Sequence, residues 1–247
     1  MLEISQQLNY EKFYLYSIVT HSTAIEGFTI TEIENQLLFD KKIAVQKPIT
    51  ELLMNFDLKN AYDKAFEFAD KHIDISIKLL CLLSALVMKN TGSIYKNIMG
   101  EFSSANGDLR LLNVSAGRGG QSYLAWQKIP QRLQQFCDFV NNVRKTTNIS
   151  NVNEIYKLSF LAHYELASIH PWADGNGRMA RLVMNMLQKE FGVILSVVKK
   201  ENRLEYIQSL SDSKAEDNSK KFIEFMFKHH KENIQQQINE YKISMEK

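Results

Sequence analysis

The segment from His170 to Arg181, HPWADGNGRMAR, brings several chemically useful residue types together within one short stretch of the chain. Pro171 biases the preceding histidine away from the α region, so we expect a helix to stop there and to present the imidazole at the mouth of a loop. Gly175 and Gly177 let the backbone N–H groups of the loop approach a ligand closely. Since a helix is expected directly after them, the loop has the form of an anion-binding site.

The charged and polar residues of the loop indicate what the anion is. Arg178 and Arg181 lie three residues apart, in the first helical turns, where a cation opposes the helix macrodipole at a cost of about 0.3–1 kcal/mol at full exposure. A polyphosphate would offset that cost, because guanidinium groups match phosphate oxygens. Asp174 adds one carboxylate, which together with substrate phosphates is a common way of holding Mg²⁺. The side-chain amide of Asn176 can donate to the same anion.

Each of these residues also has an ordinary structural explanation when it is taken alone. A single histidine is more often structural than a base, an aspartate before glycine is more often a turn former, and an arginine pair more often belongs to a surface salt-bridge network. Their concentration in one loop favours a functional site. Trp172 is expected to be a packing anchor for that loop rather than a reactive group.

Other candidate residues are weaker. His163 lies seven residues before His170, but no third metal ligand follows at a suitable spacing, so a structural role is favoured. The pair His229-His230 lies in a charged helical segment and is expected to be exposed. Arg203 and Tyr206 follow the motif helix and can either line an adenine pocket or contribute to packing.

The motif resembles the signature of Fic-domain proteins, HPFx(D/E)GNGRxxR, with Trp172 in place of the usual phenylalanine as the only departure. The resemblance extends over about residues 73–228 and includes a flap-like segment at 107–117. It implies transfer of AMP from ATP to a Ser, Thr or Tyr hydroxyl of a target protein, with self-modification as one form of that reaction. The target itself is not identified by the sequence.

The resemblance also assigns roles to the residues of the motif. His170 is implied to be the general base that deprotonates the hydroxyl, Asp174 to hold Mg²⁺ on the α and β phosphates, and Arg178 to bind the β and γ phosphates. The implied anion hole consists of Gly175, Asn176 and Gly177. A flap at about 110–115 would position the target by adding its backbone as a strand. These roles agree with the chemistry, because attack on phosphorus needs a base poised near neutrality and preorganised donors.

A second, shorter motif bears on regulation. Residues 22–27, STAIEG, are similar to the inhibitory helix motif of the family, (S/T)xxxE(G/N). Ser22 and Glu26 are four residues apart and share a helix face. In the family this glutamate pairs with the second arginine, here Arg181, and keeps the γ-phosphate from its productive position. Although such a pair alone is usually an ordinary exposed one, its place before a well-matched loop predicts an autoinhibited enzyme.

Two alternative functions stay open. The same site can instead remove AMP from a modified protein or transfer phosphate, and Glu26 discriminates, since a de-adenylylating enzyme would need this carboxylate to activate water. The chain can also be a nucleotide-binding regulator without turnover, although the intact His170 and Asp174 argue against it.

Composition predicts an all-α fold. The 247 residues include only 10 Gly and 3 Pro, well below the roughly 12% that these two types usually supply together, which argues against a β-sandwich or a disordered chain. Helical patterns are expected before Gly27, after a capping box of Thr31 and Glu34, and at 50–71, 74–89, 129–145, 155–169 and 178–191. Two further helices, the last at 235–247, are expected at the C-terminus. A short hairpin or flap is expected within 92–120, near the active site.

These patterns suggest three regions: an N-terminal helical region with the inhibitory motif at 1–70, a catalytic core at 71–230 and a C-terminal helical tail at 231–247. With 30 basic and 28 acidic residues that are well mixed, no nucleic-acid surface is expected. The N-terminus lacks the pattern of a leader and the longest apolar run, 79–88, is too short to span a bilayer, so we expect a cytoplasmic protein with no membrane partner. Cys81 and Cys137 are expected to be small buried residues, with a disulfide left open.

Overall fold

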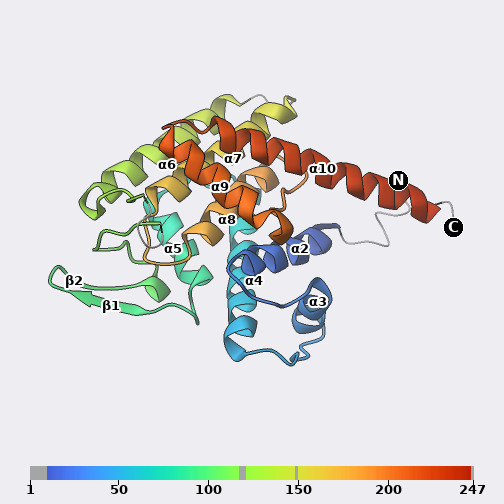
Figure 1. The fold of residues 1–247 in the computed structure, drawn as a ribbon, viewed down its shortest axis with the longest axis horizontal. Coiled ribbons are helices and arrows are strands. Elements are labelled where there is room, and N and C mark those ends of the chain that lie inside the picture. The colour runs from blue at the N-terminus through green and yellow to red at the C-terminus, as the bar shows by residue number, and fades with distance from the viewer. Residues whose placement is uncertain (1–9, 117–120, 148–149, 246–247) are drawn as a thin grey trace.

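The computed structural model describes residues 10–116, 121–147 and 150–245, which form a mostly helical structure (Figure 1). The helices are α2 (Tyr10–Ile25), α3 (Glu32–Asp40), α4 (Ile49–Asp70), α5 (Ile77–Val87), α6 (Ile129–Thr146), α7 (Val152–Ile169), α8 (Asn176–Glu190), α9 (Arg203–Ala215) and α10 (Lys220–Met245). The sheet consists of β1 (Ile94–Asn97) and β2 (Gly100–Ser103). Short 3-10 turns lie at Ser104–Asn106, Trp126–Lys128 and Lys200–Asn202. The predicted helical fold is confirmed.

Local signals explain where several helices begin. Thr31 forms both halves of the predicted capping box: its hydroxyl accepts the Glu34 N–H at 3.3 Å and its own N–H donates to the Glu34 carboxylate at 2.8 Å. Ser76 accepts the N–H of Leu79 at the start of α5. Pro130 occupies the first turn of α6, where its missing N–H leaves no helical bond unmade. The predicted helix starts at Thr31 and Pro130 are therefore confirmed.

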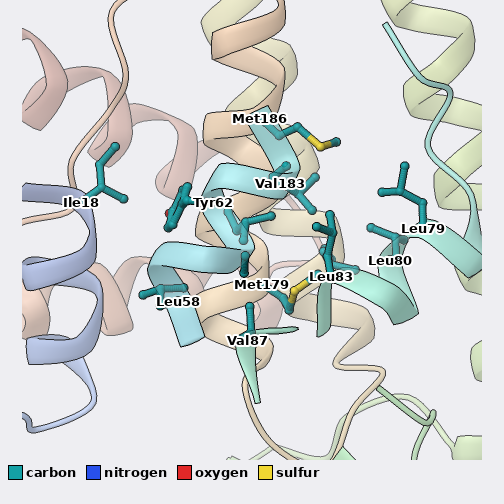
Figure 2. Close-up of a cluster of buried hydrophobic side chains, with 14 of the residues drawn as sticks. Ile18, Leu58, Tyr62, Leu79, Leu80, Leu83, Val87, Met179, Val183 and Met186 are labelled. Carbon is teal, nitrogen blue, oxygen red and sulfur yellow. The ribbon is translucent and has the colours of Figure 1, made fainter. Parts of the chain in front are cut away.

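Helix α8 is central to the main hydrophobic core, because it packs against α4, α5 and α7. Side chains from three of these helices meet in the cluster of Figure 2, among them Leu58 and Tyr62 of α4, Leu83 and Val87 of α5, and Met179, Val183 and Met186 of α8. The same cluster includes Val19 of α2 and Leu38 of α3. The N-terminal helices thus share one core with the helices that carry the motif.

A second cluster joins the C-terminal helices to the rest. Phe222 of α10 and Tyr206 of α9 pack with Phe160 of α7 and Met184 of α8. Ile25, the last residue of α2, belongs to this cluster as well. The end of α2 and the first turns of α10 therefore pack beside the helices that carry the motif.

The last helix differs from its prediction. Helix α10 begins at Lys220 and runs without interruption to Met245, so the predicted start at 235 is wrong and the predicted boundary after residue 230 falls inside a helix. His229 and His230 are only 9% and 7% exposed, whereas exposure was predicted. The reason is packing, since α10 lies on α7 and α9 and the His230 ring lies 4.3 Å from that of Tyr156. The many charged neighbours in the sequence concealed this buried face.

The region predicted to form a hairpin or flap contains two structures. Strands β1 and β2 pair antiparallel, with Ile94 opposite Ser103. Further along, Ser115 and Ser122 form an isolated antiparallel bridge, and the Tyr123 N–H donates to the Val114 carbonyl at 3.0 Å. The predicted target-binding stretch at 110–115 is not a regular strand, although its last residues pair with the segment that leads to Tyr123.

Two compositional expectations can be compared with the structure. None of the helices in the described part of the chain combines the length and the apolar character that a membrane crossing needs. Cys81 and Cys137 are free thiols, and only Cys137 is buried. The possible disulfide is therefore absent.

The core makes a direct prediction about stability. Leu83→Ala should lower the free energy of unfolding by about 2–5 kcal/mol, because the leucine is completely buried in the α4–α5–α8 cluster and the lost methyl groups leave a cavity. Its neighbour Leu82 is 42% exposed, so Leu82→Ala is the matched control and should cost less than about 1 kcal/mol. Urea denaturation followed by circular dichroism measures both values. Equal losses in the two variants would contradict this description of the core.

Candidate active site

Helices α7 and α8 are joined by the loop that carries the motif, and the loop begins at His170. This residue follows the last turn of α7 in the left-handed region, with φ of 52° and ψ of 59°, and its N–H donates to the Leu166 carbonyl at 3.1 Å. The residue before a proline is disfavoured in the right-handed α region, so the helix stops as predicted. His170 lines a cavity of about 480 Å³, which is within the usual range for small-molecule sites.

The imidazole of His170 is held by aromatic stacking. The ring of Tyr123 lies nearly parallel to it, with the ring centres 3.8 Å apart and an interplanar angle of 21°. The Lys214 ammonium group lies over the same tyrosine ring at 3.8 Å and donates to the Ser122 carbonyl at 2.9 Å. Tyr123 thereby connects the bridge at Ser115 and Ser122 to the histidine of the motif.

The surroundings of His170 favour its neutral form. Burial is the largest cause, followed by the Arg110 cation, and together they lower the pKa of the imidazole from 6.5 to about 4 despite an opposing backbone hydrogen bond to Ala167. A neutral imidazole has a free lone pair and can accept a proton near pH 7. The site therefore has a base in the required protonation state.

Arg110 precedes the motif loop in the sequence and binds the first residues of that loop. It is 1% exposed, and its side chain donates to three backbone carbonyls, those of His170, Leu112 and Leu124. Its own N–H donates to the Pro171 carbonyl at 3.0 Å. Sequence reasoning placed Arg110 only at the start of a flap, and nothing in the local pattern distinguished it from an ordinary surface arginine.

Inside the loop, the side chains of Trp172 and Asn176 close the backbone. Trp172 is completely buried and its indole N–H donates to the Gly107 carbonyl at 3.1 Å, as expected of a packing anchor. The Asn176 side chain accepts from the Trp172 N–H at 3.0 Å and donates to the Trp172 carbonyl at 2.9 Å. These bonds use the amide oxygen and one of the two N–H donors of the amide nitrogen, so the donation of this amide to an anion stays a prediction.

The backbone at the start of α8 remains suited to an anion. Gly175 precedes the helix in the left-handed region, with φ of 79°, and the first N–H groups of any helix lack acceptors within it. A side chain at Gly177 would bring its Cβ to 3.1 Å from Nη1 of Arg181 and 3.3 Å from Oε1 of Glu26. A larger residue at this position would therefore have to displace the Arg181–Glu26 pair by a few tenths of an ångström.

Arg178 and Asp174 lie next to each other at this helix start. Nη2 of Arg178 is 3.6 Å from Oδ1 of Asp174, and the same oxygen accepts the Gly175 N–H at 2.6 Å. The Arg178 side chain is almost fully buried, yet its Nε and Nη1 have no hydrogen-bond partner among the described residues. Buried donors without acceptors are costly, so they indicate that an acceptor is missing.

The second arginine of the motif has a partner, and it is the one the sequence predicts. Nη2 of Arg181 donates to Oε1 of Glu26 at 2.8 Å and to the Ser22 carbonyl at 3.1 Å, while Nε donates to the Ser22 hydroxyl at 2.8 Å. Burial opposes the charge on both partners, but the Arg181 guanidinium still holds the pKa of Glu26 below its usual range. Likewise burial is outweighed by Tyr206 and Glu26, which hold the pKa of Arg181 above its usual range. Both groups are ionised near pH 7.

The helix that supplies Glu26 is anchored at several points. Arg203 donates to the Ile25 carbonyl at 2.6 Å, where a cation also suits the helix C-terminus. The Thr23 hydroxyl lies 3.2 Å from the Asn55 side chain of α4. Arg203 and Tyr206 both line the cavity, so the two uses suggested by the sequence, lining a pocket and packing, coexist.

No group of three or more His, Cys, Asp or Glu side chains in the described part of the chain is arranged to hold a metal ion. His163, considered as a metal ligand and set aside, lies 2.9 Å from the Tyr206 hydroxyl instead. A metal near Asp174 would therefore take most of its ligands from water and from a bound phosphate, which is the usual mode for Mg²⁺.

Comparison with known proteins agrees with this geometry. Residues 74–188 match the Fic/DOC family. The motif at 170–181 lies within this match. Fic-1 of Caenorhabditis elegans, residues 134–508, has a similar structure, with a TM-score of 0.73 and 24% identity over 97% of this chain and 66% of that chain. A Fic-domain signaling protein of Bacteroides thetaiotaomicron gives a TM-score of 0.75 at 17% identity, over 89% of this chain and 84% of the other.

Several curated relatives are named protein adenylyltransferases. Protein adenylyltransferase fic-1 of Caenorhabditis elegans is 26% identical over 95% of this chain and 43% of that protein. Protein adenylyltransferase Fic of Drosophila melanogaster is 30% identical over 78% of this chain and 36% of that protein. The chain thus spans about two fifths of the length of these relatives.

The stacked arrangement of His170 predicts a pH response in the free protein. Because its pKa is lowered to about 4, the imidazole should stay neutral well below the usual 6.5, and its ¹H and ¹⁵N chemical shifts should be constant between pH 8 and pH 5.5. Tyr123→Ala removes the stacked ring and part of the burial, so the pKa should move back toward 6.5. Tyr123→Phe keeps the ring and should leave the titration unchanged. A wild-type midpoint near 6.5 would contradict the burial described for this residue.

Proposed function

We propose that this chain transfers AMP from ATP to a hydroxyl side chain of a target protein, and that the helix carrying Ser22 and Glu26 inhibits the transfer. The observation that carries the proposal is that one cavity is lined by a neutral histidine, the glycine-rich start of α8 and the Arg181–Glu26 ion pair. The names of the curated relatives support the same reaction.

The chain's own residues suffice to derive how the transfer is assisted. The target hydroxyl oxygen forms a bond to the α-phosphorus of ATP, the bond from that phosphorus to the oxygen bridging to the β-phosphate breaks, and pyrophosphate leaves. His170 accepts the hydroxyl proton, because burial keeps its imidazole neutral near pH 7 and its lone pair free. Backbone N–H groups at the start of α8, beside Gly175 and Gly177, face the charge that develops on the phosphate oxygens.

Arg178 supplies the phosphate-binding donors in this proposal. Its unpartnered Nε and Nη1 are buried, and a guanidinium group offers donors in a planar arrangement that matches phosphate oxygens. Arg178 does not line the cavity in the free chain, so binding of the β and γ phosphates of ATP would satisfy both atoms after a movement of this side chain. The orphaned donors therefore fit a polyphosphate better than they fit an apolar ligand.

Mg²⁺ also fits the residues present. Asp174 is the one acidic side chain of the motif, its side chain is 57% exposed, and one of its oxygens already accepts the Gly175 N–H. One carboxylate with nucleotide phosphates and waters is a normal magnesium site. When bound, the ion neutralises phosphate charge and orients the chain of phosphates; Asp174 is the residue that would hold it.

The inhibitory part of the proposal rests on charge. The Glu26 carboxylate occupies Nη2 of Arg181 at 2.8 Å and places a negative charge beside Gly177, where a terminal phosphate would have to come close. Two anions cannot share one guanidinium edge without repulsion. Glu26 therefore disfavours the productive position of the γ-phosphate while leaving room for a nucleotide in the cavity.

The test is labelling with ATP that carries a radioactive α-phosphate. Glu26→Gly should increase the initial rate of protein labelling, of a lysate or of the chain itself, by about tenfold or more, since each factor of ten corresponds to about 1.4 kcal/mol of removed inhibition. Adding His170→Ala to that variant should reduce the rate by about 10²–10⁴-fold, as expected for loss of a general base. Mass spectrometry of the labelled protein should find one added AMP group.

The control is Glu224→Gly, which removes an exposed carboxylate that lies 3.9 Å from Lys220, far along the sequence from the motif, and should not change labelling. If Glu26→Gly instead abolishes a measurable removal of AMP from a modified protein, Glu26 activates water and the de-adenylylating alternative is correct. If ATP binds but no variant labels any protein, the chain is a nucleotide-binding regulator and the transfer proposal fails.

A further inference from the structure

Arg181 receives most of its support from the proposed inhibitory helix. Among the described residues, three of its hydrogen bonds go to α2, to the Ser22 hydroxyl, the Ser22 carbonyl and the Glu26 carboxylate. The catalytic core contributes a different contact, since Nη1 lies 3.3 Å from the Tyr206 hydroxyl of α9. The guanidinium carbon also lies 5.9 Å from the centre of the Tyr206 ring. This contact does not depend on α2.

The direction of the hydrogen bonds follows from the chemistry of the groups. Arginine has no acceptor, so the Tyr206 oxygen must accept from Nη1 of Arg181. The hydroxyl proton is then available to donate to Nε2 of His163, which lies 2.9 Å away. A histidine can accept only in its neutral form, and burial lowers the pKa of His163 to about 3, with a smaller contribution from Arg181. The donor chain Arg181–Tyr206–His163 is therefore consistent in direction, and it places the imidazole proton on Nδ1 of His163, which has no hydrogen-bond partner among the described residues.

The three residues are arranged so that they can fix an orientation. Tyr206 and Arg181 are each 3% exposed and His163 is completely buried. The His163 ring stacks on Phe222 of α10, with the ring centres 4.8 Å apart and an interplanar angle of 21°. The tyrosine oxygen thus stands in a fixed position behind the guanidinium, on the side of α9 and α10.

We infer that Tyr206, itself oriented by His163, is a positioning residue that holds the Arg181 guanidinium in place for the terminal phosphate of the nucleotide once Glu26 no longer occupies it. The inference rests on the proposed function, because it assigns the arginine a phosphate ligand. It goes beyond that function by assigning to Tyr206 the role of orienting Arg181 when the contact between Glu26 and Arg181 is lost.

The test compares nucleotides that differ only in the terminal phosphate. In the Glu26→Gly background, Tyr206→Phe should weaken ATP binding about tenfold, the effect of losing one hydrogen bond to a charged group, while ADP binding stays the same. In the presence of Glu26 the same substitution should have a smaller effect on ATP, because α2 still holds the arginine. Isothermal titration calorimetry on the full chain gives the six dissociation constants that this comparison needs: ATP and ADP for the two Glu26→Gly proteins, and ATP for the two proteins that keep Glu26.

The matched control is Tyr62→Phe. Tyr62 is also completely buried, and its hydroxyl donates to the side chain of Asn185 on α8 at 3.0 Å, one turn after Arg181. Removing this hydroxyl should leave the ratio of ATP to ADP affinity unchanged. An equal change in that ratio for both tyrosine variants, equal losses for ATP and ADP, or no loss with Tyr206→Phe would each overturn the inference.

Variants of His163 provide an independent test if Tyr206→Phe does not fold. His163→Gln keeps an acceptor for the tyrosine hydroxyl and should preserve the ATP-to-ADP ratio, whereas His163→Leu removes the acceptor and should lower it. An identical ratio in the two His163 variants would contradict the positioning role. Nucleotide binding is measured without any AMP transfer, so the two proposals can fail separately. Failure of AMP labelling refutes the proposed function. A ratio of ATP to ADP affinity that does not change in the Tyr206 and His163 variants refutes only the present inference.

Discussion

The ion pair between Arg181 and Glu26 is the interaction on which the arrangement of the site depends. Arg181 is 3% exposed, whereas the Glu26 side chain is 37% exposed. Removing a guanidinium from water is costly, and removal of its carboxylate partner leaves an uncompensated buried charge, so the pocket around Arg181 requires negative charge in every state. Either a side chain of the chain itself or a bound anion must supply it.

The rest of the fold holds α8, which carries Arg181, next to α2, whose end carries Glu26. Helix α8 shares the main core with α2 through α4, and Arg203 secures the last carbonyl of α2. The Arg110 side chain donates to the carbonyl of His170, at the start of the motif loop, and to those of Leu112 and Leu124. Arg181 and His170 therefore belong to one packed assembly, and the cavity that they line is also lined by Tyr123.

The features that the sequence predicts well are those with local signals. The capping box at Thr31, the loop at His170 and the pairing of Glu26 with Arg181 each rest on residues close together or on two complete motifs. Tyr123 could not be found in the same way, because its stacking partner lies 47 positions away (170 − 123) and no periodic pattern marks an aromatic side chain that is half buried. The loop-closing bonds of Asn176 were not predicted either, because its residue type suits an anion and gives no sign that the tight loop also uses its amide.

The position of Glu26 relative to its helix has a thermodynamic consequence. Helix α2 ends at Ile25, so the carboxylate is carried by the terminal turn, while Val19 and Ile18 hold the helix body in the core. Terminal turns open with far smaller free energies than cores do. In the proposed inhibition, opening of this turn, with loss of the Arg203 contact to the Ile25 carbonyl, is enough to withdraw the carboxylate while the helix body stays docked. Control of the site would then be a local opening at a helix end and would need neither domain movement nor loss of global stability.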